Sequence, residues 1–109
     1  EVLTIRENTH LDKMAKATIS MVSKSIQSFI KQNLIIAHEV IEQDDTVDEL
    51  FNRVKKETIS LIHEDPGKGE ECVAIVMIGK YFERIGDHAS NIAEWVEFAI
   101  TGEYKGGSL

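Results

Sequence analysis

Two pairs of carboxylic acids in this sequence are each separated by one helical turn. Asp44 and Asp48 form the first pair, and Glu83 and Asp87 form the second. Residues four apart on an α-helix point the same way, so the two carboxylates of each pair repel each other. A metal ion, a basic partner or solvent must offset that repulsion. Which of the three applies decides the function that the sequence predicts.

The first pair interrupts an apolar stripe on a predicted helix. Asp44 and Asp48 fall on the same helical face as residues that we expect to be buried. Those residues are Ala37, Val40, Ile41, Phe51, Thr58 and Ile62. Burying an unpaired carboxylate costs several kcal/mol, and a bound cation would offset this cost. Alternatively, the helix bends away here, or Lys80, Lys55 or Arg84 pairs with the aspartates.

The second pair lies nearly opposite an apolar stripe on its own helix. This stripe contains Ile78, Phe82, Ile85 and Ala89. We therefore expect Glu83 and Asp87 in a groove or facing another subunit, and not at the centre of a helical bundle. The alternative is that Lys80 with Glu83, and Arg84 with Asp87, form ordinary surface ion pairs, which contribute little.

Taken together, the two pairs supply four oxygen ligands from two helices. Oxygen ligands suit magnesium, calcium and manganese, and carboxylates that bridge several ions also suit iron. The expected cofactor is a divalent or multinuclear metal, with iron, zinc, manganese, magnesium and calcium all open. Gly79 and Gly86 would let a metal or a neighbouring helix approach the backbone closely, and His88 is the one credible nitrogen ligand.

The sequence does not indicate a catalytic site. A di-iron enzyme of the ferritin type needs two Glu-x-x-His motifs on four helices, and this chain has one copy, at Glu7 and His10. We find no nucleotide-binding loop and no pairing of a nucleophile with a histidine. We therefore expect a protein that is not an enzyme.

Three long helices must position these acids. The apolar periodicity predicts helices at about residues 9–31, 34–64 and 70–101. Thr9 and Asn33 are expected to cap the first two helices, and Pro66 ends the second. Short connections and the absence of strand signals predict an all-α, antiparallel up-down bundle within one domain of residues 1–109, with flexible ends.

Composition narrows the possible partners. The 109 residues include 12 basic and 19 acidic side chains, a net charge of −7. This excess argues against binding nucleic acid or anionic lipid, which requires a basic patch. Cys72 is the sole cysteine, so an intrachain disulfide is excluded and a reducing, cytoplasmic setting is expected. No window resembles a membrane span or a signal peptide, so we expect no direct membrane insertion.

Three segments resemble the repeat of the PhoU family of phosphate-signalling regulators. The specific segment is 83–94 (ERIGDHASNIAE), supported by 44–50 (DDTVDEL) and 64–66 (EDP). The resemblance covers about residues 9–104. It implies a three-helix repeat with two Glu/Asp-x-x-x-Asp motifs that bind metal, here Asp44 with Asp48 and Glu83 with Asp87. It also implies a negative regulator that contacts the ATPase of a phosphate ABC transporter and a sensor histidine kinase.

PhoU proteins usually carry two such repeats, and this chain resembles the second repeat alone. We therefore expect a fragment, or the regulatory domain of a longer protein, and a homodimer that covers the apolar surface around Val73 and Val76. The runner-up is the cytoplasmic PhoU-like domain of a sodium/phosphate cotransporter-type protein. A carboxylate di-metal enzyme and a purely structural bundle rank below these two.

Overall fold

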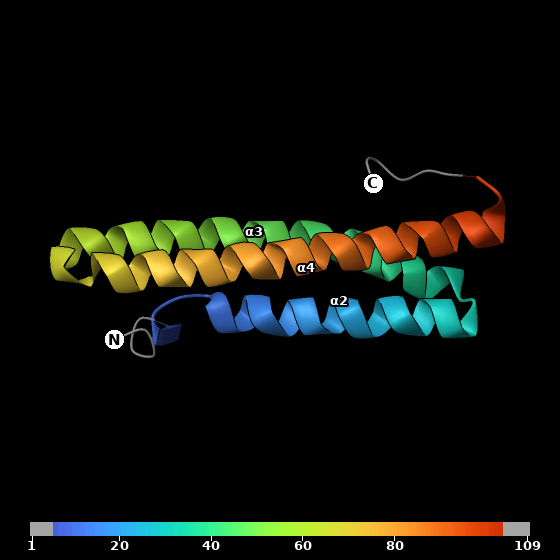
Figure 1. The fold of residues 1–109 in the computed structure, drawn as a ribbon, viewed down its shortest axis with the longest axis horizontal. Helices are drawn as coiled ribbons and strands as arrows, with labels where there is room; N and C mark the ends of the chain where they lie inside the picture. The colour runs from blue at the N-terminus through green and yellow to red at the C-terminus, as the bar shows by residue number, and fades with distance from the viewer. Residues whose placement is uncertain (1–5, 104–109) are drawn as a thin grey trace.

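Three long helices form an antiparallel bundle in the computed structural model, which describes residues 6–103 (Figure 1). Helix α2 spans Leu11–Lys31, α3 spans Leu34–Glu64, and α4 spans Gly69–Thr101. A short 3₁₀ turn, η1, at Pro66–Lys68 connects α3 to α4. The all-α, up-down fold class is thus confirmed. The predicted flexible ends fall largely outside the described residues.

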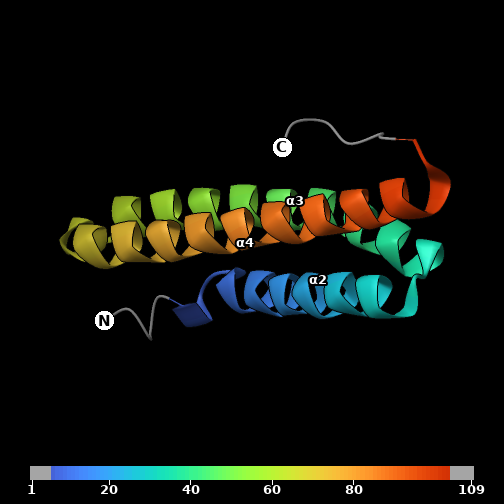
Figure 2. The ribbon, with the colours of Figure 1, turned by 45° about the vertical axis from the view of Figure 1, so that its right-hand side comes forward.

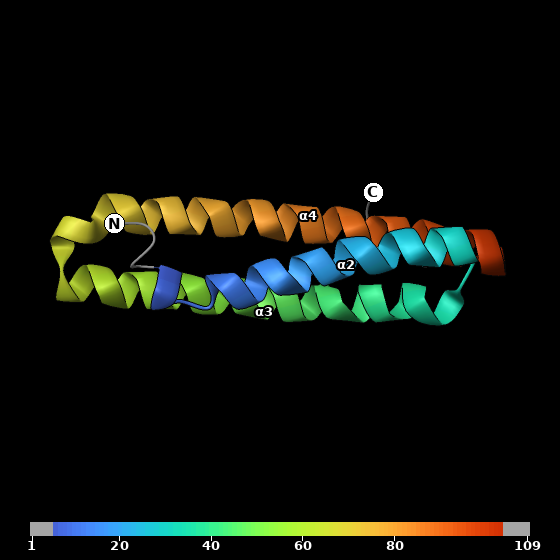
Figure 3. The same ribbon diagram turned by 90° about the horizontal axis from the view of Figure 1, so that it is seen from below.

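The bundle is long and thin, with principal extents of 53 × 22 × 15 Å. Helices α3 and α4 lie side by side along most of its length, and α2 covers one side of that pair (Figure 2). Seen from below, α2 begins over α3 and ends closer to α4 (Figure 3). In the described part of the chain, no helix is long and apolar enough to cross a lipid bilayer.

Local signals explain where the helices start and stop. The side chain of Asn33 accepts a hydrogen bond from the amide of Ile36 at 3.0 Å, as expected of a helix N-cap. His10, and not Thr9, holds the N-cap position of α2, although Oγ1 of Thr9 accepts a hydrogen bond from the Leu11 amide at 3.3 Å. The His10 amide donates to Oε1 of Glu57 in α3 at 2.8 Å. The start of α2 is therefore satisfied by a local hydroxyl and by a side chain from the neighbouring helix.

The core is built from medium-sized side chains on α2 and α3 and small ones on α4. Its buried members include Met14 and Met21 of α2, and Val40, Val47 and Val54 of α3. Along the middle of α4 the buried residues are small, namely Gly79, Gly86, Ala89, Ser90 and Ala93, whereas larger ones, Cys72, Ile75 and Val96, are buried nearer its ends. Small side chains allow α4 to pack closely on the other two helices.

Two details of the predicted core are wrong. Val47 and Val54 occupy the centre of the buried face of α3, so Asp44 and Asp48 lie at its edge and not within it. On α4, Ile85 of the predicted apolar stripe is exposed instead of central, and Ile92, seven residues further on, is exposed as well. The reason is that glycine, alanine and serine line the buried face of α4, and they carry almost no hydrophobic signal in the sequence.

Candidate metal centre

Three of the four predicted acids meet on the α3–α4 pair. Asp44 and Asp48 extend from successive turns of α3, and Asp87 extends from α4. Each offers one carboxylate oxygen, and these oxygens all lie within 4.8 Å of one another. Asp44 and Asp48 are half-buried, whereas Asp87 is exposed. The aspartate trio, meaning Asp44, Asp48 and Asp87, is thus open to solvent on one side.

The charges of the trio work against each other. Burial, together with the nearby charges of Asp87 and Asp48, raises the pKa of Asp44 to about 7. Burial also raises the pKa of Asp48, and the charges of Glu83 and Asp87 raise it by smaller amounts. Without a counter-ion, the site therefore holds more negative charge than it can stabilise near neutral pH.

One oxygen of the trio lacks a partner. Oδ1 of Asp44 is buried and accepts no hydrogen bond from the described residues. It lies 3.8 Å from the position that a Cβ atom at Gly86 would take, so it points towards the α4 backbone. A buried carboxylate oxygen without a donor costs free energy, and a cation would remove that cost. The residues of the trio thus fit a hard metal ion.

Glu83 does not join the trio. Its Oε1 accepts a hydrogen bond from Nζ of Lys80 at 2.6 Å, and its side chain is 18% exposed. The surface ion pair that the sequence allowed between these two residues is therefore present. Arg84, by contrast, lies with its guanidinium 5.6 Å from the ring centroid of Tyr81.

A second acidic group, which the sequence analysis missed, lies further along the same two helices. The imidazole of His38 on α3 pairs with the carboxylate of Glu97 on α4, whose side chain is 7% exposed. Oε2 of Glu94 is buried without a hydrogen-bond partner among the described residues. Glu94 follows Asp87 by seven residues, and this spacing was the available signal. His88 is exposed, and the trio does not include it.

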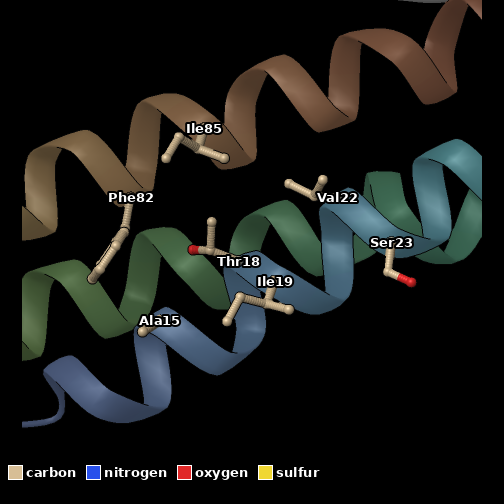
Figure 4. A pocket seen from close by; sticks show the side chains of 7 residues that line it. All are labelled: Ala15, Thr18, Ile19, Val22, Ser23, Phe82 and Ile85. Atoms are coloured by element: carbon tan, nitrogen blue, oxygen red, sulfur yellow. The ribbon is translucent and has the colours of Figure 1, made fainter.

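An apolar pocket lies on the other side of α4, between α2 and α4 (Figure 4). Its lining comprises Ala15, Thr18, Ile19, Val22, Ser23, Phe82 and Ile85. Ile19 is 68% exposed, and Ile26 and Ile30 extend this apolar surface along α2. The apolar surface was expected around Val73 and Val76. Val73 is exposed, but Val76 is partly buried against the core.

The fold and the site together define the class of protein: it is a three-helix bundle that carries an acidic cluster on one side of α4 and an apolar face on another side. Residues 11–96 match the PhoU domain model. The chain therefore belongs to the PhoU domain family, as its sequence motifs indicated.

Curated relatives agree with this assignment. The chain is 34% identical over 90 residues to a phosphate-specific transport system accessory protein PhoU homolog of Clostridium acetobutylicum, covering 83% of the chain and 41% of that relative. It is 37% identical over 93 residues to the homolog of Zymomonas mobilis, covering 85% of the chain and 39% of the relative. A homolog of Deinococcus radiodurans is 28% identical over 98 residues, covering 90% and 46%. The chain thus spans less than half the length of these relatives.

Proposed function

We propose that this chain is a regulatory module of phosphate uptake that acts through protein contacts in the cytoplasm and catalyses no reaction. The observation that carries the proposal is the PhoU domain match over residues 11–96. Its relatives are named as accessory proteins of the phosphate-specific transport system. The proposed partners are the ATPase of a phosphate ABC transporter and a sensor histidine kinase. A net charge of −7 suits basic surfaces on such partners.

We further propose that the aspartate trio binds a metal ion. Asp44 and Asp48 would hold it from α3, and Asp87 from α4. Carboxylate oxygens favour hard ions such as manganese, magnesium and calcium, and bridging carboxylates also suit iron. The bound cation would supply positive charge between two helices whose own acids repel. Metal loading would thereby stiffen the α3–α4 pair and change the charge that this face presents to a partner.

The domain is also proposed to form a homodimer. The apolar face of α2 and α4 around Ile19 and Ile85 is the surface assigned to the second copy. Support comes from its exposed isoleucines and from the relatives, which are more than twice as long as the matched segment and have room for a second unit.

The regulatory role is tested in the host. The gene that encodes this chain is deleted, and phosphate uptake and a phosphate-starvation reporter are measured in phosphate-rich medium. A negative regulator predicts that both rise on deletion and return to normal when the unaltered gene is restored. Unchanged uptake and reporter activity would contradict the proposed role.

The partner contacts are tested with purified proteins. We expect the protein to bind the phosphate-transporter ATPase or the cytoplasmic part of the sensor kinase, and to ignore the ATPase of an unrelated ABC transporter. Equal binding to both ATPases, together with no binding to the kinase, would show that the proposed partners are wrong.

A further inference from the structure

Lys80 lies beside the aspartate trio on the same side of α4. Its Nζ donates a hydrogen bond to Glu83 at 2.6 Å, and its side chain is 44% exposed while that of Glu83 is largely buried. The Lys80 ammonium also lies 6.0 Å from the ring centroid of Phe51. A half-exposed cation thus compensates a shielded carboxylate that solvent reaches poorly.

The Lys80–Glu83 pair and the trio share one electrostatic environment. Lys80, Glu83 and Asp87 follow each other at three- and four-residue spacing, so they occupy one face of α4. The Glu83 carboxylate and the Lys80 ammonium both lie within electrostatic range of Asp48 on α3. A charge placed at the trio therefore acts on Glu83 and Lys80 as well.

A metal ion and Lys80 would compete for the same carboxylate. Three aspartates offer few ligands to an ion that prefers six or more oxygens, and Glu83 is a nearby carboxylate that is already partly shielded from water. A divalent cation at the trio attracts Glu83 and repels the Lys80 ammonium. The half-exposed Lys80 can move into solvent, whereas Glu83, which is only partly exposed, stays against the helices.

We propose that Lys80 is a tethered counter-ion that holds Glu83 away from the trio, and that a divalent metal recruits Glu83 by displacing the Lys80 ammonium. The inference rests on the proposed metal site and assigns its regulation to a residue outside it. Lys80 thereby lowers metal affinity and confines loading to cations that outcompete one intramolecular positive charge.

Manganese binding to the purified protein tests this inference by calorimetry. Lys80→Gln is expected to tighten Mn²⁺ binding about tenfold, and Lys80→Arg, which keeps the charge, is expected to stay close to the original affinity. Lys55→Gln is the matched control, because Lys55 loses the same charge and also contacts the Phe51 ring, at 4.6 Å. Equal tightening by Lys80→Gln and Lys55→Gln would overturn the proposal, since it would reduce the effect to net charge.

A double-mutant cycle tests whether Glu83 is the group released. Glu83→Gln should weaken Mn²⁺ binding more in the Lys80→Gln protein than in the original, because only there is the carboxylate free to bind at no cost. Additive effects of the two substitutions on Mn²⁺ affinity would contradict the proposal that the metal replaces the Lys80 ammonium at Glu83. If no variant binds Mn²⁺ or stabilises with it, the metal site itself fails and this inference fails with it; Mn²⁺ binding without coupling refutes the inference alone.

Labelling of the amine provides a second measurement. Acetylation of Lys80 by acetic anhydride, followed by mass spectrometry, should increase several-fold when Mn²⁺ is added, while acetylation of Lys56 stays constant. Unchanged Lys80 acetylation in a protein that binds Mn²⁺ would contradict displacement of the ammonium.

Discussion

Asp44 is the residue at which burial and charge conflict most directly. It is half-buried, it faces Asp48 and Asp87, and its Oδ1 has no hydrogen-bond donor among the described residues. Spacing alone predicted that Asp44 and Asp48 share a face. It could not predict that Val47 would take the core position, because the two alternatives differ by a small rotation of α3 that packing decides.

The acidity of Asp44 leads to a prediction about pH. The pKa rises from an ordinary value of 3.8 to about 7, so between these values the folded state binds more protons than the unfolded state. Stability then falls as pH rises, and the metal-free protein should lose about 1–2 kcal/mol between about pH 4 and about pH 8. Asp48, whose pKa is also raised, contributes with the same sign.

Urea unfolding with a chelator present measures this effect. Asp44→Asn should flatten the pH dependence and stabilise the protein at the upper end of the range. Asp45→Asn, an exposed neighbour with the same change in charge, should have a smaller effect. A protein that becomes more stable through this range, with no difference for Asp44→Asn, would contradict the account.

Glu83 shows that residue spacing alone cannot predict the partner of a single side chain. Sequence placed it with Asp87, and both the metal-ligand and the ion-pair interpretation were open. The side-chain conformation of Lys80 decides between them in the metal-free protein. A one-turn spacing predicts which side chains can meet, but a flexible lysine within reach can pair with one of the carboxylates and keep it from the other.

At the scale of the helix, α4 carries the features that were hardest to predict from the sequence. It has a buried face that is made of small residues along its middle, an exposed apolar face that includes Ile85 and Ile92, and an acidic side. Periodicity identified an apolar stripe but not the face that is buried, since isoleucine dominates a hydrophobic pattern while glycine and alanine do not. Helix number and direction were predictable because they depend on length and on the breaks at Asn33 and Pro66.

Two glycines in the interior of this helix, Gly79 and Gly86, predict opposite results on substitution. A Cβ at Gly79 would lie 3.0 Å from Cε1 of Phe51, whereas a Cβ at Gly86 would meet Sδ of Met21 at 3.4 Å and Val47 at 3.6 Å. Gly79→Ala should therefore destabilise the protein by about 1 kcal/mol, because overpacking against a buried ring exceeds the gain in helix propensity. Gly86→Ala should be neutral or stabilise by up to about 1 kcal/mol.

Free energies of unfolding in urea compare the two variants directly. They share the same chemical change within one helix, so each serves as the control for the other. Equal effects at both positions would show that the close approach of α4 to Phe51 does not limit packing.

At the scale of the whole molecule, exposed apolar surface on α2 and α4 is the main feature left unexplained by a monomer. The chain spans less than half of its relatives, and Ile19 and Ile85 line an apolar pocket that solvent reaches. Contiguous apolar surface of this kind usually marks an interface. A single repeat predicted the need for a second copy, but the sequence pattern placed the dimer surface near Val73, because it does not show how α2 and α4 lie together.

Self-association provides the corresponding prediction. Sedimentation at tens of micromolar should show a dimer, and Ile19→Glu should shift it to monomer because it places a charge in the apolar pocket. Ile59→Glu is the matched control, since Ile59 is similarly exposed but lies on α3, outside the pocket. A monomer for the original protein, or equal disruption by both variants, would contradict the assigned interface.

The most direct test of the central claim is the metal content and melting temperature of the purified protein, with a chelator and with added Mn²⁺. Saturating metal should raise the melting temperature by about 10 °C, as expected for a ligand at about one hundred times its Kd. Asp44→Asn/Asp48→Asn and Asp87→Asn should abolish both the metal and the shift. Asp45→Asn/Glu49→Gln, an exposed pair with the same spacing, should retain them. If no cation shifts the melting temperature, and the trio variants are neutral or more stable at every condition, the acids form a solvated ridge and the metal centre is refuted.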